Sequence, residues 1–249
     1  MQFLQFVLPF QRVADESDLL PNKTYFFFSH VIKGQPENMP LLQSILDKNI
    51  QLFDYEAIAS EVVQDDKIKK KRLVAFGKYA GIAGMIDTFQ CLGRSLLAGG
   101  YSTPFLNVPP SYIHYDLHSA KKSIVEMGNR IQNNGLPKNM DPLVFGFTGN
   151  GNVTRGALEI FQLLPHQMIS IEEAAKLKKE GPHHCVYGVM IQQKDIVEKI
   201  DGEDEFDVRH YRENPAEYRS TFAEKVAPFV NVIVNGIYWD ERYPRELAV

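Results

Sequence analysis

The segment from Pro142 to Pro165, PLVFGFTGNGNVTRGALEIFQLLP, constrains the fold of this chain more than any other. Its apolar run at 143–147 has the length of a buried strand and is too short to form a helix of its own. A glycine-containing stretch at 148–152 then interrupts the strand. Apolar residues follow at the three- and four-residue steps of one helical face: Val153, Ala157, Ile160, Phe161 and Leu164. This order predicts a strand, a glycine turn and a helix.

The glycine turn matches part of the fingerprint G-x-G-x-x-G, in which a strand, a turn and a helix bind a dinucleotide. Gly149 permits a sharp turn, and Gly151 lets backbone N–H groups approach a pyrophosphate at the positive end of the helix. Thr154 stands where the third glycine is expected, and the next glycine is Gly156. Because a lone G-x-G is weak evidence, a tight turn without a ligand is the alternative interpretation.

Length and composition favour a globular protein that binds small molecules. The 249 residues suffice for one large α/β domain or two small ones, since typical domains hold about 100–150 residues. Because the net charge is −4, we expect no nucleic acid partner. No apolar run reaches the roughly 18–20 residues of a membrane span, so we expect no membrane association. Cys91 and Cys185 fit neither a disulfide framework nor a metal-ligand spacing, so we expect two thiols and no metal.

Strand and helix patterns alternate along the chain. Strands are expected at 24–29, 50–55, 72–76, 143–147, 185–191 and 230–239, and helices at 38–49, 78–100, 118–135, 152–164 and 170–179, with one more starting at Pro215. The charge run at 64–72 is expected to be a solvated loop. Gly81 and Gly84 predict close approach of another helix or a ligand to the helix at 78–100. The alternation favours parallel sheets with helices on both faces and ligand sites at the carboxyl ends of the strands.

His30 is the first candidate for chemistry, because it directly follows the expected strand at 24–29. Its imidazole titrates near neutral pH, which suits proton transfer. Taken alone, a hydrogen-bonded structural histidine is the commoner case. For Gln35 and Arg72, a surface amide and a solvated basic residue are likewise the default interpretations.

Four segments together resemble one enzyme family. HVIKGQPENM, KRLVAFGKYAGIAGMID, FTGNGNVTRGALEIF and VNGIYWDERYPR are similar, in the same order, to the lysine-2-oxoglutarate reductase half of the bifunctional α-aminoadipic semialdehyde synthases. More distantly they resemble the lysine-forming saccharopine dehydrogenases and alanine dehydrogenase. The resemblance runs from about Lys23 onward. It implies an α/β fold with two Rossmann-like parallel-sheet domains of the alanine dehydrogenase/saccharopine dehydrogenase type, the first of them incomplete in this chain.

The resemblance and a proline-rich stretch at 103–112 together predict the domain boundaries. We expect a partial substrate-binding and catalytic domain at 1–116 and a connecting helix and linker at 117–141. A dinucleotide-binding domain at 142–239 and the start of a return segment at 240–249 would follow.

The resemblance implies a reaction and assigns substrate residues. Family members join L-lysine to 2-oxoglutarate and reduce the imine with NADPH, rather than NADH, to saccharopine in lysine degradation. His30 matches the family's acid/base histidine. Gln35 and Arg72 match substrate-binding positions, and a guanidinium suits a bidentate grip on a carboxylate. Phe76 matches an apolar substrate contact.

The resemblance also assigns a cofactor site. Lys71 stands where saccharopine dehydrogenases place an arginine near the cofactor, and Asn235 and Gly236 match a turn near the nicotinamide. Ser170 lies near the end of the second strand of this domain. An acid at that place favours the ribose hydroxyl of NADH, and a basic residue favours the 2′-phosphate of NADPH. Because serine is neither acidic nor basic, this position does not distinguish the two cofactors. The expected pyrophosphate contacts are Gly149, Gly151, Asn152 and Val153.

Two departures from the family lead to an expectation of weak or absent catalysis. The family's catalytic lysine and an earlier substrate-binding arginine have no match in FVLPFQRV, and Lys23 is the first lysine. The chain also stops ten residues after Trp239, whereas the family continues through a long segment. A fragment or shortened paralogue is therefore expected. The alternatives are an inactive nucleotide-binding paralogue or regulatory subunit, and an alanine-dehydrogenase-like enzyme that aminates another 2-oxo acid.

The expected partners follow from the same resemblance: L-lysine, 2-oxoglutarate and saccharopine, with a homo-oligomer as an option. Animal family members are mitochondrial and plant members cytosolic. The start of this chain has neither signal-peptide nor transit-peptide features. We expect a mitochondrial protein, with a cytoplasmic one as the alternative.

Overall fold

The computed structural model describes residues 6–7, 16–64, 67–177, 183–202, 206–237 and 242–244, without the side chains of 6, 7, 63, 64 and 67–69. Contacts between Cα atoms divide the chain into unit 1, Met1–Phe76, and unit 2, Gly77–Val249. Most of FVLPFQRV and of the expected return segment at 240–249 lies outside the described residues, as does Trp239.

Unit 1 contains a small parallel sheet, and its helix lies between two strands along the chain. Its strands pair in the order β1 (Phe6–Val7), β2 (Thr24–Phe27) and β3 (Gln51–Asp54), with α1 (Met39–Asp47) between β2 and β3. The expected β-α-β unit is thus confirmed. The helix buries Leu41 and Ile45, whereas Leu46 is 65% exposed. Three 3₁₀ turns complete the unit: η1 (Glu16–Asp18), η2 (Pro36–Asn38) and η3 (Tyr55–Ala57).

The charged segment of unit 1 forms a β-hairpin, so the expected loop at 64–72 is wrong. Strands β4 (Ala59–Gln64) and β5 (Lys67–Arg72) pair antiparallel, and Glu61 lies opposite Lys70. Opposite charges across a ladder favour this pairing, which the charge run alone does not reveal. The strand expected at 72–76 is also wrong, because β5 ends at Arg72.

Unit 2 is built on a four-stranded parallel sheet. The strand order is β11 (Val232–Asn235), β6 (Val144–Thr148), β8 (Val186–Ile191) and β7 (His166–Met168). Every residue of β6 is buried, as the sequence predicts. Its neighbours in the sheet are β11 and β8, although β7 is the next strand along the chain.

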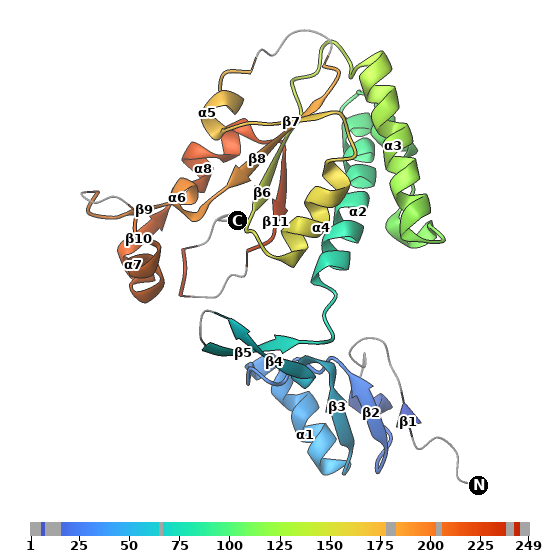
Figure 1. Cartoon of the computed structure of the whole chain (residues 1–249), viewed down its shortest axis with the longest axis vertical. Coiled ribbons are helices and arrows are strands. Elements are labelled where there is room, and N and C mark those ends of the chain that lie inside the picture. Colours follow the sequence, from blue (N-terminus) through green and yellow to red (C-terminus); the bar gives the residue numbers. More distant parts are fainter. Residues whose placement is uncertain are drawn as a thin grey trace. The chain divides into compact units, whose positions relative to one another are not determined.

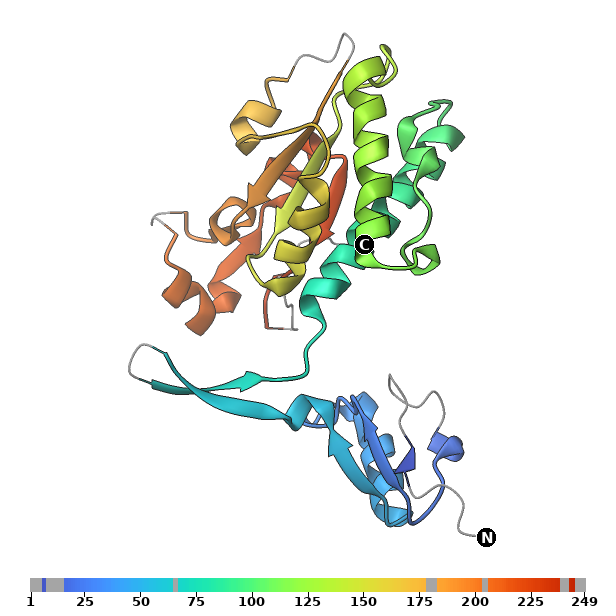
Figure 2. The ribbon, with the colours of Figure 1, turned by 45° about the vertical axis from the view of Figure 1, so that its right-hand side comes forward.

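Helices cover both faces of this sheet. Because side chains alternate along a strand, Phe145 and Phe147 pack into one apolar cluster and Val144 into another. The first cluster joins the sheet to α2 (Gly77–Ala98), α3 (Leu117–Asn134) and α4 (Asn152–Phe161) (Figure 1, Figure 2). The second includes residues of α5 (Ile171–Ala174), α6 (Gln193–Ile196), α7 (Val208–Glu213) and α8 (Phe222–Lys225).

The remaining elements are short. Strands β9 (Val197–Lys199) and β10 (Tyr218–Ser220) form an antiparallel pair. The 3₁₀ turns are η4 (Pro104–Asn107), η5 (Ser111–Ile113), η6 (Pro215–Glu217) and η7 (Ala227–Phe229), so the helix expected at Pro215 is a single 3₁₀ turn. Within the described part of the chain, no helix combines the length and apolar character of a membrane span.

Helices α2 and α4 touch through their backbones. A Cβ atom at Gly81 of α2 would overlap the Val153 carbonyl of α4, and one at Gly156 would overlap the Lys78 carbonyl. The close approach predicted at Gly81 is therefore confirmed, with a helix as the neighbour. At Gly84 no atom of the described residues lies within 4 Å of the added Cβ position, so no helix approaches there, and the approach of a ligand stays a prediction. This contact places α2 in unit 2, so the division after Phe76 differs from the boundary expected at residue 116.

One carboxylate links α4 to two other helices. Glu159 of α4 accepts from Lys121 of α3 and from Lys78 of α2, each at 2.6 Å. The hydrogen bonds from Lys121 and Lys78 hold the pKa of Glu159 below its ordinary value.

Two glycines of α2 give a matched test of the helix contact. Gly81→Ala should lower the free energy of unfolding of unit 2 by about 1–3 kcal/mol, because the methyl group meets backbone that cannot move aside. Gly84→Ala should raise it by about 0.5–1 kcal/mol, because the site is open and alanine is the better helix former. Urea denaturation of both variants measures the difference. Equal effects would contradict the backbone contact.

Candidate functional site

The glycine turn after β6 has the geometry that only glycine tolerates at its first position. Gly149 has φ = +75°, and an added Cβ would lie 2.8 Å from the Gly236 carbonyl oxygen. Gly151 is different, because no atom of the described residues lies within 4 Å of its added Cβ position. It precedes α4, and no side chain caps the helix at this residue. The first amides of α4 are therefore not covered by a capping side chain.

Hydrogen bonds fix the turn to the neighbouring strand. Thr148 donates its hydroxyl to Asn235 Oδ1 at 2.6 Å and accepts from the Gly236 amide at 3.1 Å. The buried Thr154 donates Oγ1 to the Thr148 carbonyl at 2.9 Å. Thr154, at the third fingerprint position, thus joins α4 to β6 through its hydroxyl. The residue that allows α4 to pack closely against α2 is Gly156.

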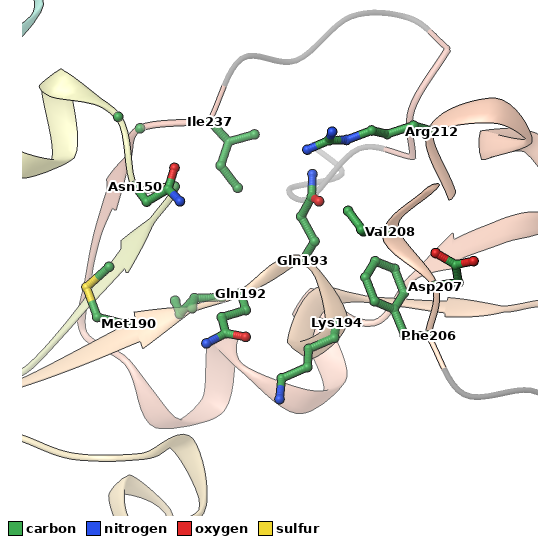
Figure 3. A pocket seen from close by; sticks show the side chains of 14 residues that line it. Asn150, Met190, Gln192, Gln193, Lys194, Phe206, Asp207, Val208, Arg212 and Ile237 are labelled. Atoms are coloured by element: carbon green, nitrogen blue, oxygen red, sulfur yellow. The ribbon is translucent and has the colours of Figure 1, made fainter. Parts of the chain in front are cut away.

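A pocket of about 1030 Å³ opens at this turn (Figure 3). Gly149, Gly151 and Gly236, three of the predicted cofactor-binding residues, line one side. The end of β8 and the start of α6 supply another side, the segment entering α7 supplies a third, and Asn150 and Ile237 lie next to the glycines in the chain. These additional lining residues are Asn150, Met190, Ile191, Gln192, Gln193, Lys194, Phe206, Asp207, Val208, Arg212 and Ile237.

Four other predicted cofactor residues of unit 2 do not line this pocket. Asn152 and Val153 form the first turn of α4, where the Val153 carbonyl packs against α2. Asn235 Oδ1 accepts from the Thr148 hydroxyl and from the Ile237 amide, so the side-chain oxygen of Asn235 stabilises the turn. Ser170 caps α5 in the predicted capping box with Glu173. Since β8 and not β7 lies beside β6, the neighbouring strand end is at Gln192.

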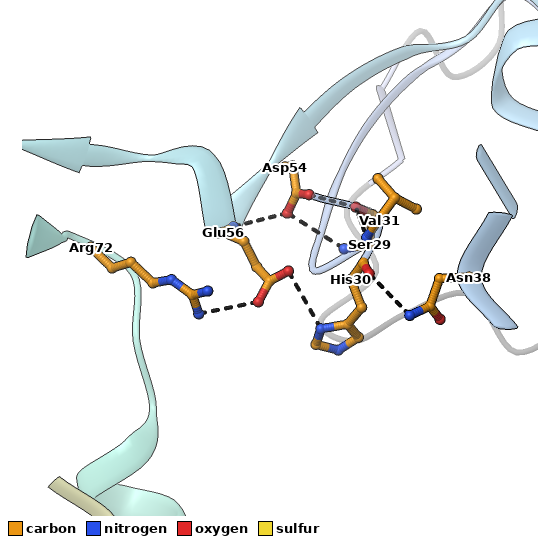
Figure 4. Close-up of polar contacts among 7 residues, drawn as sticks. All are labelled: Ser29, His30, Val31, Asn38, Asp54, Glu56 and Arg72. Carbon is orange, nitrogen blue, oxygen red and sulfur yellow. Dashed lines mark hydrogen bonds and ion pairs between the residues drawn. The ribbon is translucent and has the colours of Figure 1, made fainter. Parts of the chain in front are cut away.

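In unit 1, polar groups gather where β2 and β3 end side by side (Figure 4). His30 follows β2 with φ = +60°, a conformation that is uncommon outside glycine and often found at functional positions. Its Nδ1 lies 3.5 Å from Glu56 Oε2, and the Arg72 guanidinium lies 3.1 Å from Glu56 Oε1. The Glu56 side chain is only 9% exposed, whereas those of His30 and Arg72 are about half exposed. One carboxylate thus joins two of the predicted residues.

Further contacts hold this cluster in place. The buried Ser29 donates Oγ to Asp54 Oδ2 at 2.5 Å, and Asn38 donates to the His30 carbonyl at 3.0 Å. The Phe28 ring lies 6.4 Å from the His30 ring and 5.6 Å from the Phe76 ring. The backbone around His30 is therefore fixed on both sides.

The other predicted residues of unit 1 are more peripheral. Phe76 is 44% exposed and packs edge-on against Phe28. Gln35 is half-buried before η2, and Lys71 is exposed on β5.

Comparison with known proteins finds relatives that share one name. The chain is 43% identical over 237 residues to an α-aminoadipic semialdehyde synthase of Arabidopsis thaliana, covering 91% of this chain and 22% of the relative. It is 38% identical over 234 residues to the mitochondrial α-aminoadipic semialdehyde synthases of Mus musculus and Bos taurus, covering 94% of this chain and 24% of each relative. The chain is a homologue of part of α-aminoadipic semialdehyde synthase.

The resemblance to α-aminoadipic semialdehyde synthases inferred from four segments is therefore confirmed. The chain spans less than a quarter of the length of these synthases. No family model matches the chain.

Sequence reasoning missed two groups of residues in this synthase homologue. Glu56 follows β3 as His30 follows β2, so its position after a parallel strand was the available signal. The pocket residues at 190–194 and 206–212 depend on the strand order, which the sequence does not reveal. Cys91 and Cys185 are free thiols, as expected.

The two glycines of the turn should respond differently to alanine. Gly149→Ala should lower the free energy of unfolding by at least about 1–2 kcal/mol, because of its positive φ and the nearby Gly236 carbonyl. Gly151→Ala should leave it unchanged or raise it by up to about 1 kcal/mol. Thermal melting of both variants distinguishes them. A loss in Gly151→Ala as large as that in Gly149→Ala would contradict the open space beside Gly151, because the change of N-cap residue alone costs less than about 1 kcal/mol.

Proposed function

We propose that this chain belongs to an oxidoreductase that condenses L-lysine with 2-oxoglutarate and reduces the product with NADPH to saccharopine, in lysine degradation. The homology to α-aminoadipic semialdehyde synthases supports the enzyme class. The observation that carries the proposal is the glycine turn, whose Gly151 borders open space at the uncapped start of α4. A pyrophosphate needs such close access to backbone amides.

Unit 1 supplies the groups that a condensation requires. Loss of water from the carbinolamine formed by amine and ketone needs a proton donor, and the imidazole of His30 is the side-chain type most often used for proton transfer. Glu56 Oε2 lies 3.5 Å from its Nδ1 and holds the ring from one side. Arg72 can bind a substrate carboxylate. In this structure its guanidinium pairs with the Glu56 carboxylate.

Unit 2 supplies the binding site for the reductant. When NADPH is bound, it would provide the hydride for the imine carbon. Gly149, Gly151 and Gly236 would lie against its phosphates or nicotinamide, and Asn235 keeps the turn at Gly236 in place. We propose Asn152, Val153 and Lys71 as further cofactor contacts and Gln35 and Phe76 as substrate contacts.

The mammalian relatives are named as mitochondrial, which supports a mitochondrial location over a cytoplasmic one. We propose lysine, 2-oxoglutarate and saccharopine as ligands and a homo-oligomer as the assembly. The alternatives are an inactive nucleotide-binding paralogue or regulatory subunit, and an enzyme that aminates another 2-oxo acid.

The cofactor site can be tested without catalysis. Gly151→Val should weaken NADPH binding at least about tenfold, because its side chain would occupy the open space beside the turn. The enhancement of NADPH fluorescence on titration measures the affinity. Gly84→Ala, which changes an open glycine far along the chain from the turn, is the control and should bind normally. Unchanged affinity in Gly151→Val would remove the cofactor assignment.

The reaction can be tested by following NADPH absorbance with lysine and 2-oxoglutarate together and singly. Oxidation should require both, and His30→Asn should lower kcat by about 10²–10⁴-fold. Asparagine is chosen because it tolerates the positive φ at this position while lacking a titratable group. Activity with alanine in place of lysine would favour the other aminating enzyme. NADPH binding without oxidation would favour the inactive paralogue.

A further inference from the structure

The pocket of unit 2 carries positive charge on the side away from the glycine turn. Lys194 lies at the start of α6, and Arg212 lies near the end of α7. Asp207 is the lining acid, and its carboxylate accepts from the Arg209 amide at 2.8 Å at the start of α7. This carboxylate is therefore engaged in capping its own helix.

Arg212 is the cation that faces the pocket (Figure 3). Its guanidinium extends toward the side chain of Gln193, across from Asn150 and Ile237. Among the described residues it makes no hydrogen bond or ion pair. The five N–H donors of this exposed guanidinium are thus available to a ligand.

Lys194 is placed differently. Its ammonium group points away from Arg212 in Figure 3, and the residue also lines a second pocket beside Glu172, Asp195 and Glu224. These carboxylates compete with any anion for its charge. Arg212 is therefore the better candidate for anion binding in the first pocket.

Within the described part of the chain, the end of β8 beside the glycine turn offers no free carboxylate for a ribose hydroxyl. Gln192 and Gln193 occupy the end of β8 and the start of α6, and both side chains are neutral amides. The nearest acid in sequence, Asp195, accepts from the Gln192 amide at 2.7 Å in a capping box. In dinucleotide sites an acid at this place binds the ribose of NAD, and a nearby arginine accommodates the 2′-phosphate of NADP.

We propose that Arg212 binds the 2′-phosphate of the adenosine ribose and thereby sets the preference of this site for NADPH over NADH. This inference rests on the proposed dinucleotide site. The phosphate dianion and the planar guanidinium match as a bidentate pair. Since Arg212 lies far along the chain from the strand–turn–helix fingerprint, the preference would depend on α7 and not on the end of the second strand.

The test compares NADPH and NADH binding by fluorescence titration in the whole chain and in Arg212→Gln. The original chain should prefer NADPH. The variant should bind NADPH about 10–100-fold more weakly, because charge-assisted hydrogen bonds are lost. Its affinity for NADH should stay within about twofold. Arg209→Gln, an exposed arginine of the same helix that does not line the pocket, is the control and should retain the preference.

Each other outcome has a distinct meaning. If the original chain binds NADH as tightly as NADPH, or if Arg212→Gln weakens both equally, the role of Arg212 is overturned and the dinucleotide site stands. If neither dinucleotide binds, the proposed function fails together with this inference. Competition by adenosine 2′-monophosphate but not by adenosine 5′-monophosphate, lost in Arg212→Gln, would support the assignment independently.

Discussion

Unit 2 depends on backbone segments that approach too closely to admit a side chain. Gly81 and Gly156 allow α2 and α4 to touch, and Gly149 turns the chain beneath the Gly236 carbonyl. The first contact fixes α4 against its neighbour, and the second fixes the turn that precedes α4. Because close-packed backbone leaves little freedom for adjustment, the start of α4 has one position relative to the sheet. The pocket forms at that position.

The sequence predicts the local elements of unit 2 well and their arrangement less well. A short apolar run, two glycines and a helical period are all local signals, and they correctly predict β6, the turn and α4. The place of α2 was missed because the prolines after it look like a domain boundary. The lack of a side chain at Gly81 lets α2 pack against the Val153 carbonyl of α4, and these two residues lie far apart in the sequence.

The same distinction applies to the candidate sites. His30 could be proposed because it follows a strand and fits a known family. The contacts of Glu56 with both His30 and Arg72 depend on the pairing of β2 with β3. Ser170 was chosen because β7 follows α4 along the chain. The structure places β8 beside β6, so the residues near the turn come from a later part of the chain. Strand order is a long-range property, and no local pattern encodes it.

Glu159 has a consequence for how unit 2 responds to acid. Its two carboxylate oxygens hold different helices, Oε1 accepting from Lys121 and Oε2 from Lys78. The ionised form contributes to stability above the ordinary pKa of a glutamate, and this contribution is lost as the pH falls through the lowered pKa in the folded state. A single protonation therefore weakens both ion pairs at once. Acidification thus releases α4 from Lys78 and Lys121 together, while the apolar cluster and the backbone contact between α2 and α4 remain.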